Sequence, residues 1–234
     1  VWQYIFARGL TIFLILNLYL FFDEGKKFYK NYFNIGISGL TGGIGLGVAM
    51  VSFIYSITNT SAAITLLCLA AMPFFTALLG FLFLKEKVSL NVWLSIIVAT
   101  VGLTIIAVGN TEKASLVGLV FGITSSIGFS VFSVSLRWRK ETPKFTTVAT
   151  AGLFCMILAS LFILSNKVSF FSSSYNGSLF SLHGTIVCMG LILYSIGSKS
   201  IPAAELTLLS LTEVIGGIFW VWLPLFGINE IPST

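Results

Sequence analysis

Charged residues are scarce in this chain. Asp, Glu, Lys and Arg together make up 9% of its 234 residues, whereas a soluble domain carries about 25%. So few charges cannot cover a globular surface in water, which excludes an ordinary soluble enzyme or binding domain. The hydrophobic share of 56% instead predicts a polytopic membrane protein.

Histidine and cysteine are also rare, which limits the available chemistry. The chain has one histidine, His183, and three widely spaced cysteines within apolar runs, Cys68, Cys155 and Cys188. Such a set offers neither a disulfide framework nor metal-ligand spacing. We therefore expect no metal, no cofactor and, without a nucleotide-binding motif, no coupling to ATP within this chain. The net charge of +5 is attributed to Lys and Arg in the loops of a membrane protein, and not to a nucleic-acid-binding surface.

Eight apolar segments approach the roughly 20 residues that a membrane-spanning helix needs. They cover residues 3–22, 34–57, 58–84, 89–109, 115–136, 145–165, 179–197 and 202–226. The linkers are short, so any function must lie within or between the helices. The sequence thus predicts an all-α, polytopic membrane helical bundle.

Basic residues orient this bundle in the membrane. Loops after the odd-numbered segments hold ten Lys and Arg residues, and loops after the even-numbered segments hold only Lys113 and Lys167. Because cytoplasmic loops are rich in Lys and Arg, the odd-numbered loops are expected to be cytoplasmic. We expect an integral protein of the plasma membrane, the inner membrane if the source is a bacterium.

An internal repeat relates the third and eighth segments. "YSI", "AAITLL" and "LKEKVS" (residues 55–57, 62–67 and 84–89) recur in the same order as "YSI", "AAELTLL" and "INEIPS" (residues 194–196, 203–209 and 228–233). The copies are five helices apart and so cross the membrane in opposite directions, which is the inverted-repeat arrangement of many secondary transporters. We expect five-helix repeats at residues 1–109 and 115–234. Eight of ten helices would then be present, because the first repeat lacks its first helix and the second its last.

The two matched stretches carry a family resemblance. "TSAAITLLCLAAMPFFTALLGFLFLKEKVS" and "IPAAELTLLSLTEVIGGIFWVWLPLFGINEIPS" resemble the signature segments of the EamA-like family of drug/metabolite transporters. Met72-Pro73 and Glu213-Val214 occupy the central position of each, and Glu86 and Glu230 close them. Val214 departs from the proline often found there. The resemblance implies transport of small metabolites, such as amino acids or nucleosides, or of drugs, without naming a cargo.

Glu213 is the first candidate for a site residue. It lies one residue from the centre of segment 202–226, where an ionised group costs from about 3 to well over 10 kcal/mol. A carboxylate there can exchange a proton for a substrate amine; the alternative is a protonated side chain that only hydrogen-bonds a neighbouring helix. Nearby polar candidates are Thr212 and Ser210. Tyr194 and Trp220 are candidates to line the path, with packing or lipid contact as the alternative.

Arg8 is the charged side chain inside the first predicted span. It lies about one and a half turns from the outer end of the first segment, so snorkelling to the outer headgroups is the simplest expectation. The alternative is that it faces an outer vestibule, where it would attract anionic groups. Direct pairing with Glu213 is not expected.

Small residues mark packing faces and candidate hinges. Gly39, Gly43 and Gly47 follow one another at intervals of four, a spacing that lets helices approach closely in lipid. Gly118, Gly122, Ser126 and Ser130 repeat that spacing. Pro73, Gly216 and Gly217 lie near mid-span in the two matched segments, where a kink or hinge would serve alternating access.

A competing reading is an intramembrane serine protease. "GISG" at residues 36–39 matches a G-x-S-G motif, and such an enzyme needs Ser38 and His183 within hydrogen-bond reach. The predicted topology places them near opposite faces, about 18 Å apart in depth. A purely structural membrane protein is a further alternative. We therefore expect a transporter rather than an enzyme, with the bilayer and a small-molecule substrate as partners, protons as a candidate coupling ion, and a homodimer left open.

Overall fold

The computed structural model describes residues 1–108, 115–139, 141–171, 173–213 and 215–216. Every regular element in these ranges is a helix. Six helical stretches are long and apolar enough to cross a membrane: Trp2–Phe33, Gly36–Asn59, Ile64–Leu84, Leu116–Trp138, Lys144–Ser165 and Tyr175–Gly197. The predicted all-α polytopic bundle is confirmed.

The elements follow one another with short connections. They are α1 (Trp2–Glu24), η1 (Gly25–Tyr29), α2 (Lys30–Phe33), α3 (Gly36–Asn59), α4 (Ala62–Leu69), α5 (Met72–Leu79), η2 (Gly80–Leu84), α6 (Leu90–Val108), α7 (Leu116–Trp138), α8 (Lys144–Ser165), α9 (Ser174–Gly197) and α10 (Ala203–Ser210). The stretch between the first two predicted spans is therefore helical rather than a simple linker.

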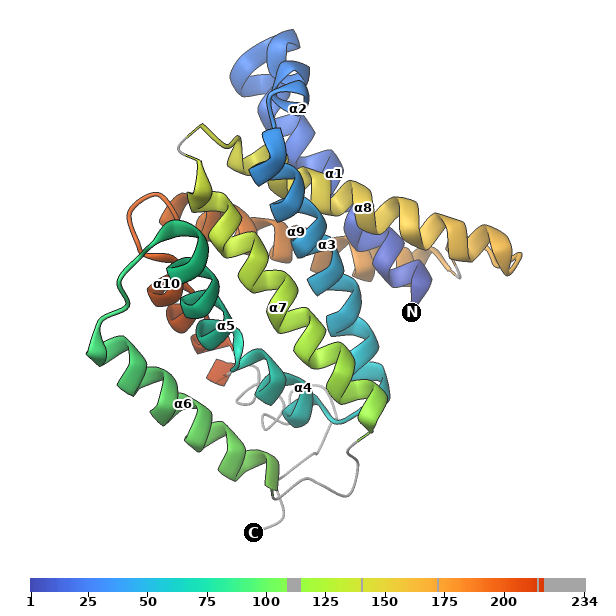
Figure 1. Ribbon diagram of the computed structural model, residues 1–234. Coiled ribbons are helices and arrows are strands. Elements are labelled where there is room, and N and C mark those ends of the chain that lie inside the picture. The colour runs from blue at the N-terminus through green and yellow to red at the C-terminus, as the bar shows by residue number, and fades with distance from the viewer. Residues whose placement is uncertain (109–114, 140, 172, 214, 217–234) are drawn as a thin grey trace.

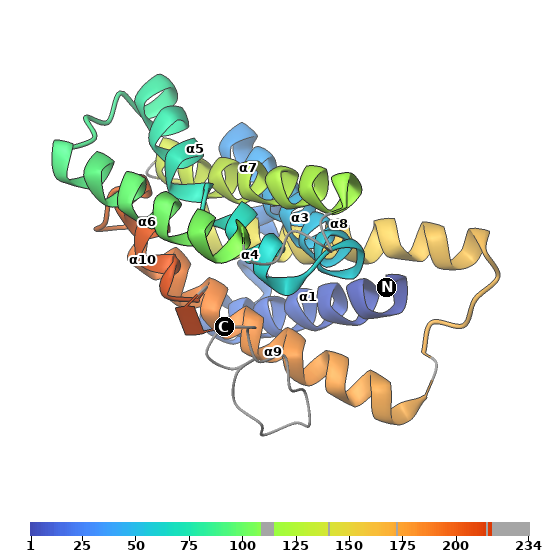
Figure 2. The same ribbon diagram turned by 90° about the horizontal axis from the view of Figure 1, so that it is seen from below.

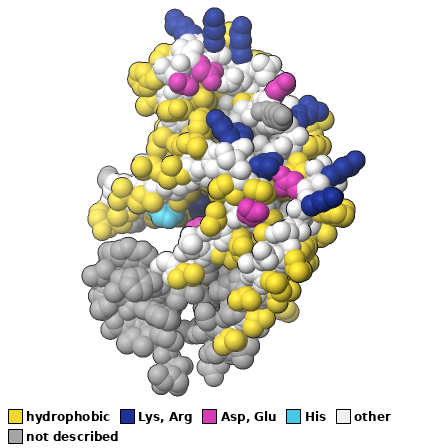
Figure 3. All heavy atoms as spheres, turned by 90° about the vertical axis from the view of Figure 1, so that its left-hand side faces the viewer, with side chains coloured by type: hydrophobic (Ala, Val, Ile, Leu, Met, Phe, Trp, Pro, Cys, Tyr) yellow, Lys and Arg dark blue, Asp and Glu magenta, His cyan; other side chains and the backbone are white. Residues whose placement is uncertain are grey.

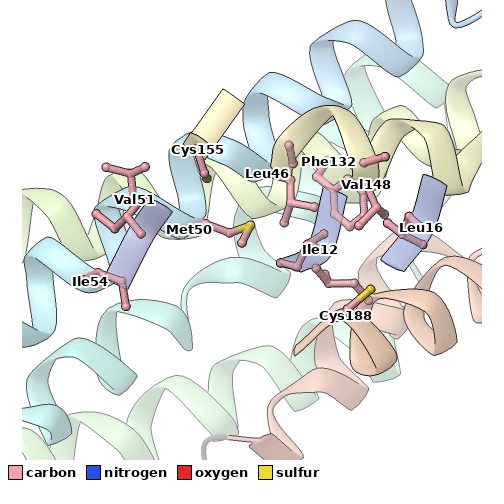
Figure 4. Packing of buried hydrophobic residues seen from close by; sticks show 14 of the residues in the cluster. Ile12, Leu16, Leu46, Met50, Val51, Ile54, Phe132, Val148, Cys155 and Cys188 are labelled. Carbon is pink, nitrogen blue, oxygen red and sulfur yellow. The ribbon is translucent and has the colours of Figure 1, made fainter. Parts of the chain in front are cut away.

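The long helices α1, α3, α7, α8 and α9 pack against one another at the centre of the described structure. Helix α3 packs between α7 and α8, and α1 packs between α8 and α9, as seen from below in Figure 2. The largest buried cluster lies where these helices meet (Figure 4), with Ile12 and Leu16 from α1, Leu46 from α3, Phe132 from α7 and Val148 from α8. This body positions the remaining helices around it.

Glycine pairs allow the closest of these helix contacts. A Cβ atom built on Gly9 of α1 would lie 2.8 Å from the carbonyl oxygen of Gly152 on α8. A Cβ atom built on Gly152 would likewise lie 2.8 Å from the carbonyl oxygen of Gly9. Gly45 of α3 and Gly128 of α7 form a similar pair. A Cβ atom on Gly45 would lie 2.9 Å from the Gly128 carbonyl oxygen, and one on Gly128 would lie 2.6 Å from the Gly45 carbonyl oxygen. Because any larger residue would collide with a neighbouring backbone, these four positions determine how near the axes lie.

The third predicted span, 58–84, is not one continuous helix. Helix α4 ends at Leu69 and α5 begins at Met72. We call the intervening Ala70–Ala71 the first helix break. A matching interruption follows α10, where Leu211 forms a turn before helical residues resume at 212; we call this the second helix break. Each break comes after eight helical residues.

The two breaks also share a hydrogen-bond pattern. The amide of Ala71 bonds to the carbonyl of Cys68, three residues back, and the amide of Leu211 bonds in the same way to Leu208. Ordinary helical bonding then resumes from the carbonyls of Ala71 and Leu211. Two segments that the sequence relates as repeats therefore deviate from a regular helix at equivalent places.

Helix α6 matches the predicted fourth segment and lies at the edge of the molecule (Figure 1), where it contacts α4 and α10. The predicted eighth segment, 202–226, is described only as far as Gly216. In Figure 1 the α7–α8 and α9–α10 connections lie at the upper left, and the α3–α4 and α8–α9 connections lie at the right. This separation agrees with alternation of the loops between two faces.

Candidate functional site

The two helix breaks lie against each other. Leu66 and Ala70 of the first broken segment form a small buried cluster with Leu211, the turn residue of the second. Helices α5 and α10 are also in contact. Helices broken within a bilayer free backbone groups for other partners, and such groups are tolerated only where protein or a cavity covers them. We therefore place the candidate site at the contact between the two breaks.

Serines on α7 bond to the carbonyls around the first break. Ser126 Oγ donates to the carbonyl of Cys68, and Ser130 Oγ donates to the carbonyl of Met72 at 3.0 Å. Both serines are fully buried. These bonds satisfy backbone carbonyls on both sides of the interruption, so the break is part of the packed structure rather than a local defect.

Glu213 lies two residues beyond the second break. Its side chain is exposed in the structure, although enough protein surrounds it for Arg8 on α1 to act on it electrostatically. Glu213 forms no ion pair with Arg8 or with any other described residue. The carboxylate is therefore accessible and lies near a positive charge, without being neutralised by direct contact.

Arg8 lies inside the protein, and the expectation that it snorkels to the headgroups is wrong. Its side chain is 9% exposed, and its Nε atom has no hydrogen-bond partner among the described residues. Helix α9 comes so close that a Cβ atom on Gly184 would lie 3.2 Å from the Arg8 Cα atom. A buried guanidinium with an unused donor is costly, so an acceptor is expected to bind there.

Tyr4 and His183 complete the surroundings of Arg8. The Tyr4 hydroxyl and His183 Nδ1 lie 2.6 Å apart in a hydrogen bond between α1 and α9. Both side chains are near enough to Arg8 to interact with its charge. Figure 3 shows the histidine, in cyan, on the surface of this side of the molecule. No sequence motif associates these side chains with Arg8: Tyr4 lies one turn earlier on the same helix, and His183 lies on α9, far away in the chain.

The other predicted site residues are placed as follows. Thr212 and Ser210 hydroxyls donate to the carbonyls of Leu209 and Thr207 in their own segment. The Tyr194 hydroxyl is hydrogen-bonded to Ser133 at 2.6 Å, and its ring packs on Phe129 and Phe132, so it joins α9 to α7. A Cβ atom on Gly216 would meet open space. Trp220 and Gly217 lie outside the described residues.

The small-residue face of α3 packs on α8. A Cβ atom on Gly43 would lie 2.8 Å from the Thr150 Cβ, and one on Gly39 would lie 3.0 Å from Thr147 Oγ1. Gly47 of α3 faces Phe154 of α8. Pro73 is buried in the first turn of α5, directly after the first break. A missing N–H costs nothing at that position, which suits proline there.

A second polar group lies at the ends of the helices, on the face expected to be cytoplasmic. Glu86 accepts a hydrogen bond from Arg137 Nε, and Arg137 Nη1 donates to the carbonyls of Ser198 and Ile201. The amide of Ala203, at the start of α10, bonds to the other Glu86 oxygen at 3.4 Å. This network connects the end of the first broken segment to the beginning of the second, and only Glu86 was singled out from sequence.

The residues of the proposed protease dyad have separate partners. Ser38 Oγ is hydrogen-bonded to Thr142 Oγ1 at 2.7 Å, whereas His183 is bonded to Tyr4. Within the described ranges, no group of three or more His, Cys, Asp or Glu side chains could hold a metal ion. Ser38 and His183 therefore do not form a hydrogen-bonded dyad in this structure.

Comparison with known proteins identifies related transporters. Residues 1–108 match the model of the EamA-like transporter family. An uncharacterized transporter of Helicobacter pylori strain J99 is 27% identical over 228 residues, which cover 92% of this chain and 74% of the relative. A second, from strain 26695, is 26% identical with the same coverage. The resemblance predicted from the motifs is therefore confirmed, and it supports a membrane transporter.

One further match is local. A stretch of 53 residues is 42% identical to part of the DNA translocase SpoIIIE of Bacillus subtilis, but it covers 23% of this chain and 7% of that protein. Such a short overlap carries no argument about function.

Proposed function

We propose that this relative of the EamA-like transporters is a secondary transporter that moves small metabolites by alternating access. The contact between the two helix breaks, at Ala70 and Leu211, carries the proposal. In inverted-repeat transporters the substrate site lies at the interface of the repeats, near the midplane, and is formed by discontinuous helices. Here the discontinuities lie at equivalent places in the segments that the sequence relates, which supports repeats at residues 1–109 and 115–234.

The charges beside the second break support a substrate of matching chemistry. Arg8 offers a buried, unused donor, and Glu213 offers an accessible carboxylate. Because the two do not pair directly, a solute that carries both an anionic and a cationic group would fit between them. Amino-acid-like zwitterions are therefore the substrate class that we propose, and Glu213 is the residue that we propose to bind the amine or a proton.

The network around Glu86 and Arg137 supports a closing contact on one face. It joins the ends of the two broken segments through an ion pair and several backbone hydrogen bonds. Alternating access requires such contacts to form in one state and break in the other. We propose that this network closes the cytoplasmic side of the path, and that the protein resides in the plasma membrane.

The test is transport by the protein reconstituted in liposomes. The substrates are radiolabelled zwitterionic amino acids, each measured with and without an imposed pH gradient. The variants are Glu213→Gln and, as a matched control, Asp23→Asn, which neutralises an exposed acid at the end of α1. We expect the native protein and the control to accumulate at least one zwitterion, and Glu213→Gln to lose the effect of the pH gradient.

Two results would contradict the proposal in different ways. Equal pH-driven accumulation by the native protein and Glu213→Gln would place the coupling site elsewhere. Transport of uncharged solutes but of no zwitterion would leave a transporter whose substrate does not bind between Arg8 and Glu213.

A further inference from the structure

A cavity separate from the helix breaks lies at the face expected to be cytoplasmic. It has a volume of about 530 Å³ and is enclosed by the last turn of α7, the first turn of α8 and the last turn of α9. This size is within the range of about 300–1,000 Å³ typical of small-molecule sites. The cavity is partly open to the outside, so a ligand can enter it from water or from the membrane surface.

Four cationic side chains line this cavity. They are Arg137, Arg139, Lys144 and Lys199. Arg137 is paired with Glu86, but none of the other three forms an ion pair with a described carboxylate, and no described residue that lines the cavity is acidic. Figure 3 shows Lys and Arg side chains gathered over the upper part of the described surface.

These cations repel one another. Lys144 lies close enough to both Lys199 and Arg137 to be affected by their charges. Its ammonium group donates to Ser198 Oγ at 3.1 Å, which is a neutral partner and leaves the charge uncompensated. Because these like charges are held together around the cavity, their repulsion raises the free energy of the empty site. A bound anion would lower that free energy.

Ser195 distinguishes this cavity from an ordinary basic loop region. Loop lysines and arginines alone are explained by the orientation rule for membrane proteins. Ser195, however, is fully buried, lines the cavity and has no hydrogen-bond partner for its Oγ among the described residues. A buried hydroxyl without a partner is unfavourable, and an oxygen of a bound anion would supply one.

We propose that this cavity binds a phosphate-bearing anion. Arginine forks match the paired oxygens of phosphate, and several cations favour a group with more than one negative oxygen. The same chemistry is offered by a soluble phosphate ester and by the headgroup of an anionic phospholipid in the adjacent leaflet. Arg8 and Glu213 do not line this cavity, so it is distinct from the proposed zwitterion site, although Arg137 also belongs to the network around Glu86.

The test measures anion binding rather than transport. Purified protein in a neutral maltoside detergent is titrated with inorganic phosphate, with chloride at equal ionic strength as reference, and its thermal unfolding is followed. In parallel, native mass spectrometry compares retention of phosphatidylglycerol with that of phosphatidylcholine. The variants are Lys144→Gln and Ser195→Ala, and Lys30→Gln is the control, since it removes an exposed charge from the same face outside the cavity.

We expect the native protein and Lys30→Gln to bind at least one of the two anions, and Lys144→Gln to bind it about tenfold more weakly, as the loss of a charged hydrogen-bond donor implies. Ser195→Ala should weaken binding without lowering stability in the absence of anion. Binding of phosphate alone would assign the cavity to a soluble phosphate-bearing anion, and retention of phosphatidylglycerol alone would assign it to the lipid headgroup. Absence of both, or equal binding by Lys144→Gln and Lys30→Gln, would overturn the proposal.

Discussion

Arg137 Nε donates a hydrogen bond to Glu86 Oε1 at 2.7 Å, and this ion pair is partly shielded from water, with about a quarter of each side chain exposed. It connects α7 to the residues that follow the first broken segment. Nη1 of Arg137 donates to the carbonyls of Ser198 and Ile201 in the α9–α10 connection. One guanidinium on α7 thus binds two other stretches of chain that are far apart in sequence.

Glu86→Gln is expected to destabilise the protein. A hydrogen bond to a charged group contributes about 1.5–3 kcal/mol, and Gln keeps the shape while losing the charge. Thermal unfolding in detergent should therefore begin several degrees lower than in the native protein. Glu141→Gln, which neutralises an exposed acid with no ion pair to a described residue, is the control. Equal unfolding temperatures for the two variants would show that the network contributes no stability.

Arg8→Gln is expected to abolish zwitterion uptake while leaving a folded protein. The guanidinium is the buried cation of the proposed site, and Gln removes its charge with a smaller change in shape than Ala. Arg8→Lys should retain part of the activity, because it keeps the charge but not the planar fork. Uptake is measured in proteoliposomes, and Lys26→Gln, an exposed cation in η1, serves as the control. Native uptake by Arg8→Gln would remove Arg8 from the site.

Gly9→Ala and Gly152→Ala are expected to lower stability, each by about 1–3 kcal/mol, since an added methyl group collides with backbone across the α1–α8 contact. Gly190 on α9 provides the comparison, because a Cβ atom there meets nothing within 4 Å. Gly190→Ala should be neutral or stabilising by up to about 1 kcal/mol through helix propensity. Thermal unfolding of the three variants in one detergent checks this ordering, and a destabilised Gly190→Ala would refute the packing explanation.

Pro73→Ala is expected to reduce transport more than stability. Proline has no amide hydrogen and disfavours continuation of α4 into α5, so alanine lets the two segments join into a regular helix. The variant should express and unfold like the native protein but transport at least severalfold more slowly. Pro143→Ala, at the start of α8, is the control. An unchanged transport rate would mean that the first helix break is maintained by its neighbours alone.

Long apolar segments made most of the fold predictable. Six predicted spans are confirmed as helices able to cross a membrane, because the bilayer requires about 20 apolar residues whatever the tertiary contacts are. The position of the first helix break was not predictable to the residue. Ala70 and Ala71 favour helix, and the features that accompany the interruption are Pro73 and the serines of α7 that bond to the carbonyls of Cys68 and Met72.

The environment of Arg8 shows why the site was harder to predict than the spans. Helix α1 has apolar residues on every side, so its protein-facing residue Ile12 and its lipid-facing residue Leu14 look alike in the sequence. Periodicity therefore could not tell whether Arg8 pointed outward or inward. Arg8 and Glu213 are 205 residues apart in the sequence and come near each other only through helix packing. A local sequence pattern cannot predict such a contact.

The serines that support the first helix break have a second acceptor within reach. Ser126 Oγ also lies 3.2 Å from the carbonyl of Gly122, and Ser130 Oγ lies 2.8 Å from that of Ser126, each one turn back in α7. A hydroxyl has one hydrogen, so each can donate to the broken segment or to its own helix. If α4 and α5 slide along α7, the hydrogen can be handed over and the serine never loses its partner. The Cys68 carbonyl also accepts a hydrogen bond from the Ala71 amide, so such a movement would leave neither this carbonyl nor the two serines without a partner.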